Sequence, residues 1–299
     1  MSLARLNVIY GHLEGTEAKF ARDPSGYLSI EAGIYQKHGL EISWNHVQGT
    51  EERYRRLESG EADISFVVGR ASLQHFLDTK ATRILGCAMN SCPYYLIVDA
   101  AIRELKDLKG KVVTCREGPA RGVPLAQVFE ERAGLILDGD VTLQLLSSDL
   151  DALNLLIGGH AHAALLPRPY GFMAEERGFE RINPWPAVVD DPLPITLETP
   201  QALTNEKERE FAAFLMAHRE GIRYVKANRH EAMRVLSARF GLPPGLVRKT
   251  CDDYLVCMDE SLTVDFKQFE RLLSQVAPEK TSDARRIASE WIVPGALRG

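Results

Sequence analysis

Two stretches of the sequence decide the fold. Residues 60–70 read GEADISFVVGR, and residues 159–168 read GHAHAALLPR. Each stretch begins with a glycine suited to a helix end and continues with a small, apolar run typical of a buried strand. Each closes with an arginine where the next helix would begin. The same order in both halves of the sequence predicts two similar α/β units.

Alternating strand and helix patterns extend outward from these stretches. A helix is predicted over 27–38, ended by Gly39, and another over 121–133, ended by Gly134. Short connections between alternating strands and helices are typical of a mostly parallel sheet covered by helices. The predicted strands cover residues 6–10, 40–44, 64–68, 84–88, 94–98 and 111–115.

The last third of the sequence has a different pattern. Residues 183–194 contain four prolines and two adjacent aspartates, which predicts a loop. Beyond residue 200 the apolar residues recur with a helical period, and there is little strand pattern. Helices are predicted over residues 205–227, 229–240, 244–254, 264–276 and 282–291.

The composition restricts the class of protein. The chain has 299 residues, of which 45% are hydrophobic and 26% charged, as in an ordinary globular protein of two compact units. A net charge of −5 argues against a nucleic-acid partner, and no apolar run reaches the roughly 20 residues that cross a bilayer. We expect a monomer without a transmembrane segment. Residues 1–10 carry no targeting signal, so we expect a cytoplasmic protein, or a periplasmic or lipid-anchored one if a signal peptide precedes Met1.

The cysteines indicate packing rather than chemistry. Their odd number prevents complete pairing, and their spacing fits no zinc site. We expect small buried hydrophobic residues, with neither a metal nor another cofactor. Cys92 is a candidate nucleophile, but no base can be assigned to it, so no catalytic residue is predicted. The five are Cys87, Cys92, Cys115, Cys251 and Cys257.

Three further phrases resemble one family in their order and spacing. Residues 26–40 read GYLSIEAGIYQKHGL, residues 57–64 read LESGEADI and residues 105–112 read LKDLKGKV. Together they resemble the substrate-binding proteins of nitrate, sulfonate, taurine and thiamine-precursor ABC transporters, over nearly the whole chain. One departure from the family pattern is His162, which lies where the second-half motif usually has aspartate.

The resemblance implies a fold and a function. The fold is α/β and two-lobed, of periplasmic-binding-protein type II (venus flytrap), with two mixed sheets flanked by helices and two hinge crossings. Lobe 1 would comprise residues 1–97 and, after the return of the chain, 196–299 with the C-terminal helices. Lobe 2 would comprise residues 98–195. The function would be to bind a small anionic or aromatic-polar metabolite in the interlobe cleft, for delivery to an ABC transporter permease.

An enzyme on the same fold is the alternative function. Decarboxylases and desulfinases that act on small aromatic acids share this architecture. A catalytic pair with perturbed pKa values in the cleft would distinguish them from a solute-binding protein. Because the sequence assigns no such pair, solute binding is the preferred hypothesis.

The candidate ligand-binding residues follow predicted strand ends, where ligands of open α/β sheets collect. An arginine beside free helix N–H groups suits a carboxylate, sulfonate or phosphate, which points to Arg70 in the first half and to Arg121 and Arg168 in the second. The alternatives are a structural ion pair for Arg70 and neutralisation of Arg121 by Glu117. The full set is His12, Glu14, Arg70, Asn90, Ser91, Glu117, Gly118, Arg121 and Arg168.

Polar and aromatic residues complete the candidate site. His12 and Glu14 lie in a predicted loop bounded by glycines, which let the backbone approach a ligand; the alternative is a solvated turn. The amide of Asn90 and the hydroxyl of Ser91 could bind polar ligand atoms. An aromatic wall, or packing in the core, is the predicted use of Tyr10, Tyr27, Tyr170 and Trp185.

Overall fold

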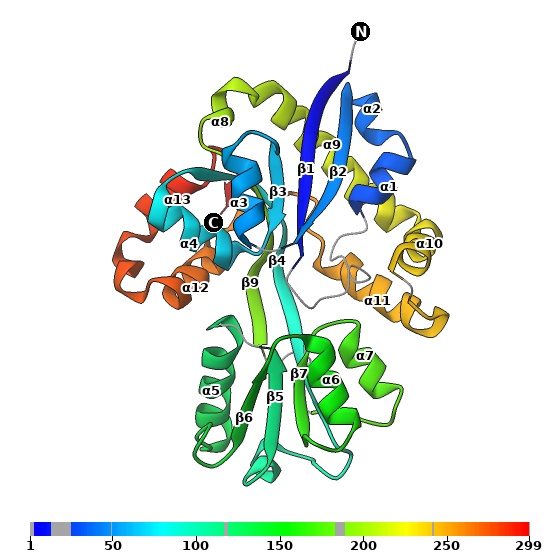
Figure 1. The fold of residues 1–299 in the computed structure, drawn as a ribbon, viewed down its shortest axis with the longest axis vertical. Helices are drawn as coiled ribbons and strands as arrows, with labels where there is room; N and C mark the ends of the chain where they lie inside the picture. Colours follow the sequence, from blue (N-terminus) through cyan, green and yellow to red (C-terminus); the bar gives the residue numbers. More distant parts are fainter. Residues whose placement is uncertain are drawn as a thin grey trace. The chain divides into compact units, whose positions relative to one another are not determined.

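The computed structural model describes residues 3–12, 25–48, 50–116, 119–182, 189–240 and 242–298. They form two compact units: unit 1 contains the described residues up to Ser91 and from Pro192 onward, and unit 2 those from Cys92 to Asp191. Each unit has a mixed sheet with helices on both faces (Figure 1). Within the described ranges the chain crosses between the units twice, in strands β4 (Thr82–Val98) and β9 (Val189–Pro200).

The sheet of unit 1 has the strand order β2-β1-β3-β9-β4. β1 (Ala4–His12) pairs in parallel with both β2 (Leu40–Gln48) and β3 (Ile64–Val67), whereas β9 is antiparallel to β3. Because β1, β2 and β3 are parallel, their carboxyl ends lie at the same edge of the sheet. We call this edge the carboxyl edge of unit 1.

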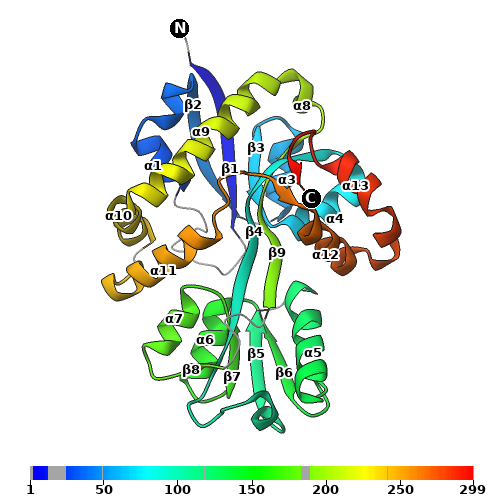
Figure 2. The same cartoon turned by 180° about the vertical axis from the view of Figure 1, so that it is seen from behind.

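Helices cover both faces of this sheet (Figures 1 and 2). One face carries α9 (Glu208–Ala227) with α1 (Ser25–Glu31), α2 (Ile34–Lys37) and α10 (Arg229–Phe240), and α11 (Pro244–Cys257) packs on α10. The other face carries α3 (Thr50–Glu58), α4 (Gly69–Thr79), α12 (Phe266–Val276) and α13 (Ala284–Trp291). Shorter elements of unit 1 are α8 (Leu203–Glu206), η3 (Pro278–Asp283) and the paired strands β10 (Val264–Asp265) and β11 (Leu297–Arg298).

The helices α1 and α9 pack closely because a glycine of α9 faces a serine of α1. A Cβ on Gly221 would lie 1.8 Å from Ser29 Oγ, so any larger residue would push the helices apart. His218, nearly one turn earlier on α9, is fully buried, and its Nδ1 lies 2.8 Å from the hydroxyl oxygen of Tyr35. The ring of Phe66 packs edge-on against His218, which joins this helix pair to β3.

The sheet of unit 2 has the strand order β4-β7-β5-β6, and β8 (Glu180–Arg181) also pairs with β4. β5 (Val112–Arg116) is parallel to β6 (Thr142–Leu146) and to β7 (Ala163–Leu166), whereas β4 is antiparallel to β7. The carboxyl ends of β5, β6 and β7 therefore share an edge, which we call the carboxyl edge of unit 2.

Alternate residues of β4 face the two helix layers of unit 2. Tyr94 and Leu96 pack with Leu125 and Phe129 of α5 (Pro119–Ala133). Tyr95 and Ile97 point to the opposite face, which is covered by α6 (Asp149–Ile157) and α7 (Tyr170–Glu175) (Figure 1). The short helix η2 (Leu105–Leu108) follows β4 and contributes Leu105 and Leu108 to the first of these two cores.

The repeated order of elements predicted from residues 60–70 and 159–168 is confirmed. Gly60 and Gly159, after α3 and α6, have φ of +76° and +71°, a left-handed conformation that favours glycine. The strands that follow, β3 and β7, are fully buried, and α4 and α7 come next. The predicted fold class, two mixed sheets flanked by helices with two chain crossings, is likewise confirmed.

Some of the predicted elements differ in the structure. The helix predicted over 27–38 is divided into α1 and α2 because Gly33 adopts a φ of +67°, which a continuing helix does not allow. The strands predicted at 84–88 and 94–98 are one continuous strand, β4. The loop predicted over 183–194 already contains the start of β9, since a proline's fixed φ is compatible with an extended strand.

No helix within the described residues is long and apolar enough to cross a membrane.

Candidate functional site

Several predicted site residues fall where side-chain placement is not described. Glu14, Glu117 and Gly118 lie outside the described residues, as does Trp185 of the aromatic set. His12 belongs to β1, Ser91 to β4 and Arg121 to α5, but their side chains lie outside the described part of the chain. The ligand-binding role of these residues stays a prediction.

Arg70 lies at the carboxyl edge of unit 1, at the strand-to-helix junction predicted from the sequence. It is the second residue of α4, directly after the buried strand β3. Its Nη2 donates to Gln275 Oε1 at 2.8 Å and its Nη1 to the Gln275 carbonyl oxygen at 3.3 Å. These bonds join α4 to α12 and fix the direction of the guanidinium. Its role in ligand binding stays a prediction.

Arg53 also belongs to unit 1, and sequence reasoning missed it. Its side chain, on α3, is only 4% exposed, and its Nε and Nη2 have no hydrogen-bond acceptor among the described residues. The guanidinium carbon lies 4.4 Å from the centroid of the Tyr54 ring. Arg53 is four residues before Leu57, so both share one helix face, but the charged residues around Arg53 give no local sign that this face is buried.

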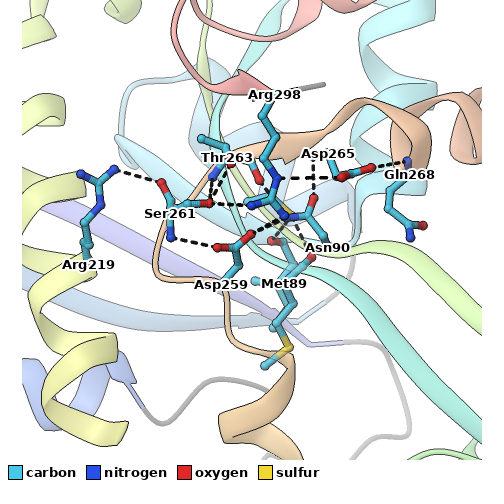
Figure 3. A network of polar contacts seen from close by, with 11 residues as sticks. Met89, Asn90, Arg219, Asp259, Ser261, Thr263, Asp265, Gln268 and Arg298 are labelled. Carbon is cyan, nitrogen blue, oxygen red and sulfur yellow. Dashed lines mark hydrogen bonds and ion pairs between the residues drawn. The ribbon is translucent and has the colours of Figure 1, made fainter. Parts of the chain in front are cut away.

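Asn90 is held in a network of polar contacts within unit 1 (Figure 3). Its Nδ2 donates to Asp259 Oδ2 at 2.9 Å and to the Thr263 carbonyl oxygen at 2.8 Å. Its Oδ1 accepts from the N–H of Asp265 at 2.8 Å. Asp265 in turn caps α12, since its Oδ1 accepts from the N–H of Gln268. Asn90 therefore fastens β4 to the start of α12.

The same network holds the C-terminal strand. Arg298 Nη2 lies 3.0 Å from Asp259 Oδ2, the oxygen that Asn90 also contacts (Figure 3). Arg219 of α9 donates to the carbonyl oxygens of Glu260 and Ser261 from the other side. Because Asn90 already uses both amide hydrogens and its oxygen here, a ligand would have to share them. That Asn90 contacts a ligand stays a prediction.

The carboxyl edge of unit 2 gathers two arginines and an aspartate. Arg168, between β7 and α7, is 6% exposed. Arg116 ends β5, and its Nη1 lies 3.8 Å from Oδ2 of Asp149, the first residue of α6. β5 pairs with both β6 and β7, so the three residues share one end of the sheet. Sequence reasoning found Arg168 and missed the Arg116–Asp149 pair.

The predicted aromatic residues are packed. Tyr10, Tyr27 and Tyr170 are all buried. Tyr10 stacks on Phe66 with ring centroids 5.6 Å apart, and the Tyr27 hydroxyl is hydrogen-bonded to Nε2 of His46. These contacts are those of residues packed in the core, which was the predicted alternative to an aromatic wall.

The described cysteines lie mostly in the core. Cys87, Cys115 and Cys251 are buried, and Cys257 is half-buried. Burial raises the pKa of the Cys87 thiol above its usual range, and burial together with Asp252 raises the pKa of Cys251 to about 11. Raised thiol pKa values oppose thiolate formation, so these two are poor nucleophiles at neutral pH. Over the described residues, no group of three His, Cys, Asp or Glu side chains could hold a metal ion.

Comparison with known proteins identifies the fold. No protein-family model matches the sequence, and no curated protein matches it. The periplasmic aliphatic sulphonate-binding protein SsuA of Escherichia coli is similar, with a TM-score of 0.71, 14% identity, and coverage of 97% of this chain and 96% of that chain. The periplasmic sulfonate-binding protein SsuA of Methylobacillus flagellatus gives 0.70, 13%, 98% and 92%. A conserved Candida albicans gene product, said to exhibit the generic periplasmic binding protein structural fold, gives 0.64, 14%, 99% and 98%. This chain has the periplasmic-binding-protein fold.

The three sequence segments that resemble the family occupy successive elements of the periplasmic-binding-protein fold, which accounts for their order. Residues 26–40 form α1, α2 and the start of β2, residues 57–64 join α3 to β3, and residues 105–112 lead into β5 of unit 2. The resemblance drawn from these phrases is confirmed, since the structural neighbours include sulfonate-binding and other ABC import binding proteins.

Proposed function

We propose that the chain is the ligand-binding component of an ABC import system and that its ligand is a small anionic metabolite. The observation that carries this proposal is the similarity to two sulfonate-binding proteins over 98% and 97% of the chain, with TM-scores of 0.70 and 0.71. One fold can host several functions, so a second argument is needed for an anionic ligand. The arginines at the strand ends supply it.

Arginines at both carboxyl edges support an anionic ligand. Arg70 begins α4 in unit 1, and Arg168 lies between β7 and α7 in unit 2. A guanidinium binds carboxylate, sulfonate or phosphate oxygens through paired N–H donors, and the start of a helix adds further N–H groups. That the ligand lies between the lobes stays a prediction. The proposed binding set is His12, Glu14, Arg70, Asn90, Ser91, Glu117, Gly118, Arg121 and Arg168.

The proposed partner is the permease of an ABC transporter. Delivery to an importer requires the protein to work on the outer side of the cytoplasmic membrane, as a periplasmic or lipid-anchored protein. Binding without chemical change is the proposed activity, which distinguishes it from an enzyme on the same fold.

A thermal-shift screen tests the proposal. The panel pairs alkanesulfonates, carboxylates and phosphate esters with neutral analogues of the same shape. A ligand that binds the folded state alone raises Tm according to its concentration relative to Kd. We expect at least one anion to raise Tm by several degrees, its neutral analogue to have no effect, and the anion to be recovered unchanged by NMR. Equal shifts with the neutral analogue would contradict the anionic ligand, and consumption of the anion would favour the enzyme.

Arg70 variants test the proposed role of this residue. Arg70→Ala should weaken binding of the anion about tenfold or more, because a charge-assisted contact is lost, and Arg70→Lys should recover part of it. Gln275→Ala is the matched control, since it removes the side-chain acceptor Oε1 that the guanidinium contacts and leaves the backbone acceptor and the charge of Arg70 in place. Equal, small effects of Arg70→Ala and Gln275→Ala on affinity would assign Arg70 a purely structural role.

A further inference from the structure

Arg53 carries a buried charge that the described structure does not neutralise. The residue is 4% exposed, and its Nε and Nη2 have no acceptor among the described residues. The other arginines of α3 differ: Arg55 and Arg56 both bond the carboxylate of Glu52. A buried guanidinium is costly unless an anion or several acceptors compensate it. Arg53 is therefore the residue of this helix whose environment calls for a further partner.

The position of Arg53 in the fold places it near the carboxyl edge of unit 1. Leu57, one turn later on the same face of α3, packs with Ile9 of β1 and Val47 of β2. α3 follows the carboxyl end of β2 and runs back along the sheet, so its first turns lie at that end. Arg53 is thus on the sheet-facing side of α3, one turn closer to the edge than Leu57.

The side chain of Tyr54 connects Arg53 to the first turn of α4. The Arg53 guanidinium lies over the ring of Tyr54, whose hydroxyl donates to the carbonyl oxygen of Ala71 at 2.9 Å. Ala71 belongs to the first turn of α4, and the N-cap residue there, Val68, has no side-chain acceptor for the helix N–H groups. Free N–H groups at a helix start attract anions, and the Tyr54 side chain links the buried guanidinium to this turn.

The buried acid on this face is engaged through one oxygen only, since Oε2 of Glu198 has no hydrogen-bond partner among the described residues. Glu198 is fully buried, and its Oε1 accepts from Ser72 Oγ and Thr82 Oγ1, both at 2.7 Å. Burial, followed by the Glu198 carboxylate, raises the pKa of Tyr54 above its usual range, whereas Arg53 acts in the opposite direction. Tyr54 therefore stays neutral between the two charges.

We propose that Arg53 is a specificity-determining residue of unit 1, and that it binds the oxyanion group of the ligand together with the first N–H groups of α4. This assignment rests on the proposed function and deepens it. The ligand class is a small sulfonate, phosphate or carboxylate, because these groups match both the planar guanidinium and the N–H groups of a helix start.

Titration calorimetry of four proteins tests the assignment, with ethanesulfonate, inorganic phosphate and acetate as probes. Arg53→Met keeps the apolar stem and removes the charge, and Arg53→Lys keeps the charge and removes the planar fork. Arg56→Met is the matched control, since it removes a charge from the same helix at a position paired with Glu52. Circular dichroism checks that each variant is folded.

We expect wild type to bind at least one probe, with Arg53→Met about 10- to 100-fold weaker, Arg53→Lys in between and Arg56→Met within about twofold of wild type. If wild type binds a probe and the folded Arg53 variants bind it equally well, the assignment to Arg53 is wrong while the proposed function stands. If wild type binds none of the probes and no other anion, the proposed anionic ligand itself is wrong. Should Arg53→Met fail to fold, the comparison of Arg53→Lys with wild type decides in the same way.

Discussion

His162 and Asp63 make the same backbone contact in the two halves of the chain. Asp63 Oδ2 accepts from the N–H of Asn7 at 2.8 Å, and His162 Nδ1 accepts from the N–H of Val112 at 3.3 Å. Each residue also donates its own N–H to the carbonyl oxygen of the same partner. The position requires a short side chain with an acceptor, and an imidazole nitrogen supplies it as a carboxylate does. The histidine in place of the usual aspartate therefore preserves the contact.

Substitution at the two positions should have unequal effects on stability. Asp63 is buried and also pairs with Lys207, whereas His162 is half-buried. We expect Asp63→Leu to lower the free energy of unfolding by about 2–3 kcal/mol and His162→Leu by about 1 kcal/mol. His162→Asp should restore the acceptor and lie close to wild type. Urea denaturation measures all three, and a His162→Asp protein as unstable as His162→Leu would contradict this explanation.

Removal of the Asn90 amide should destabilise unit 1. Asn90→Ala loses two donated bonds and one accepted bond, and it leaves the N–H of Asp265 without its acceptor. We expect the free energy of unfolding to fall by about 2–3 kcal/mol. Asn45→Ala is the control, because Asn45 is exposed and its amide donates to the hydroxyl of its near neighbour Ser43; it should cost less than about 0.5 kcal/mol. Equal urea midpoints for the two variants would show that the network does not stabilise the fold.

The contact between α1 and α9 should not tolerate a methyl group. Gly221→Ala would place Cβ against Ser29 Oγ, so we expect a loss of about 1–3 kcal/mol of unfolding free energy from overpacking. Ser29→Ala removes the hydroxyl that causes the clash. The double variant should therefore be more stable than the sum of the single effects predicts, which a double-mutant cycle measures. Strict additivity would mean that the two residues do not touch as described.

The buried thiols should resist alkylation until the protein unfolds. Because the folded-state pKa of Cys251 is raised to about 11, its contribution to stability is present below the unfolded thiol pKa of about 8.5. That contribution is lost as the pH rises from there towards the folded value. Iodoacetamide at pH 8, followed by peptide mapping, should leave Cys87 and Cys251 unlabelled without urea and label both in urea. Labelling of Cys251 in the folded protein at the rate of a free thiol would contradict its burial.

Local patterns predicted the elements well because the decisive signals are short-range. The glycines at 60 and 159 need a left-handed conformation, and the apolar runs after them are long enough only for buried strands. The strand-to-helix junction at Arg70 could be placed for the same reason. The parallel order of the strands then follows from the rules for short connections.

Contacts between distant residues could not be predicted in this way. Asn90 meets partners 169 to 175 positions later in the sequence, and no local pattern reveals which strand end will face them. Arg53 sits in a run of six residues, EERYRR, with five charges, which is typical of an exposed helix face. Its burial depends on which side of α3 meets the sheet, a property of packing rather than of composition.

The most direct measurement for the central claim compares two ligands of nearly the same shape and different charge. Titration calorimetry with methanesulfonate and with dimethyl sulfone, or with another anion and its neutral counterpart if the thermal-shift screen selects one, reports the affinity that the charge confers. We expect the anion to bind at least about tenfold more tightly than the neutral counterpart, and this advantage to shrink as salt is added. Equal affinity of the two ligands at low salt would contradict an anion-binding function for this protein.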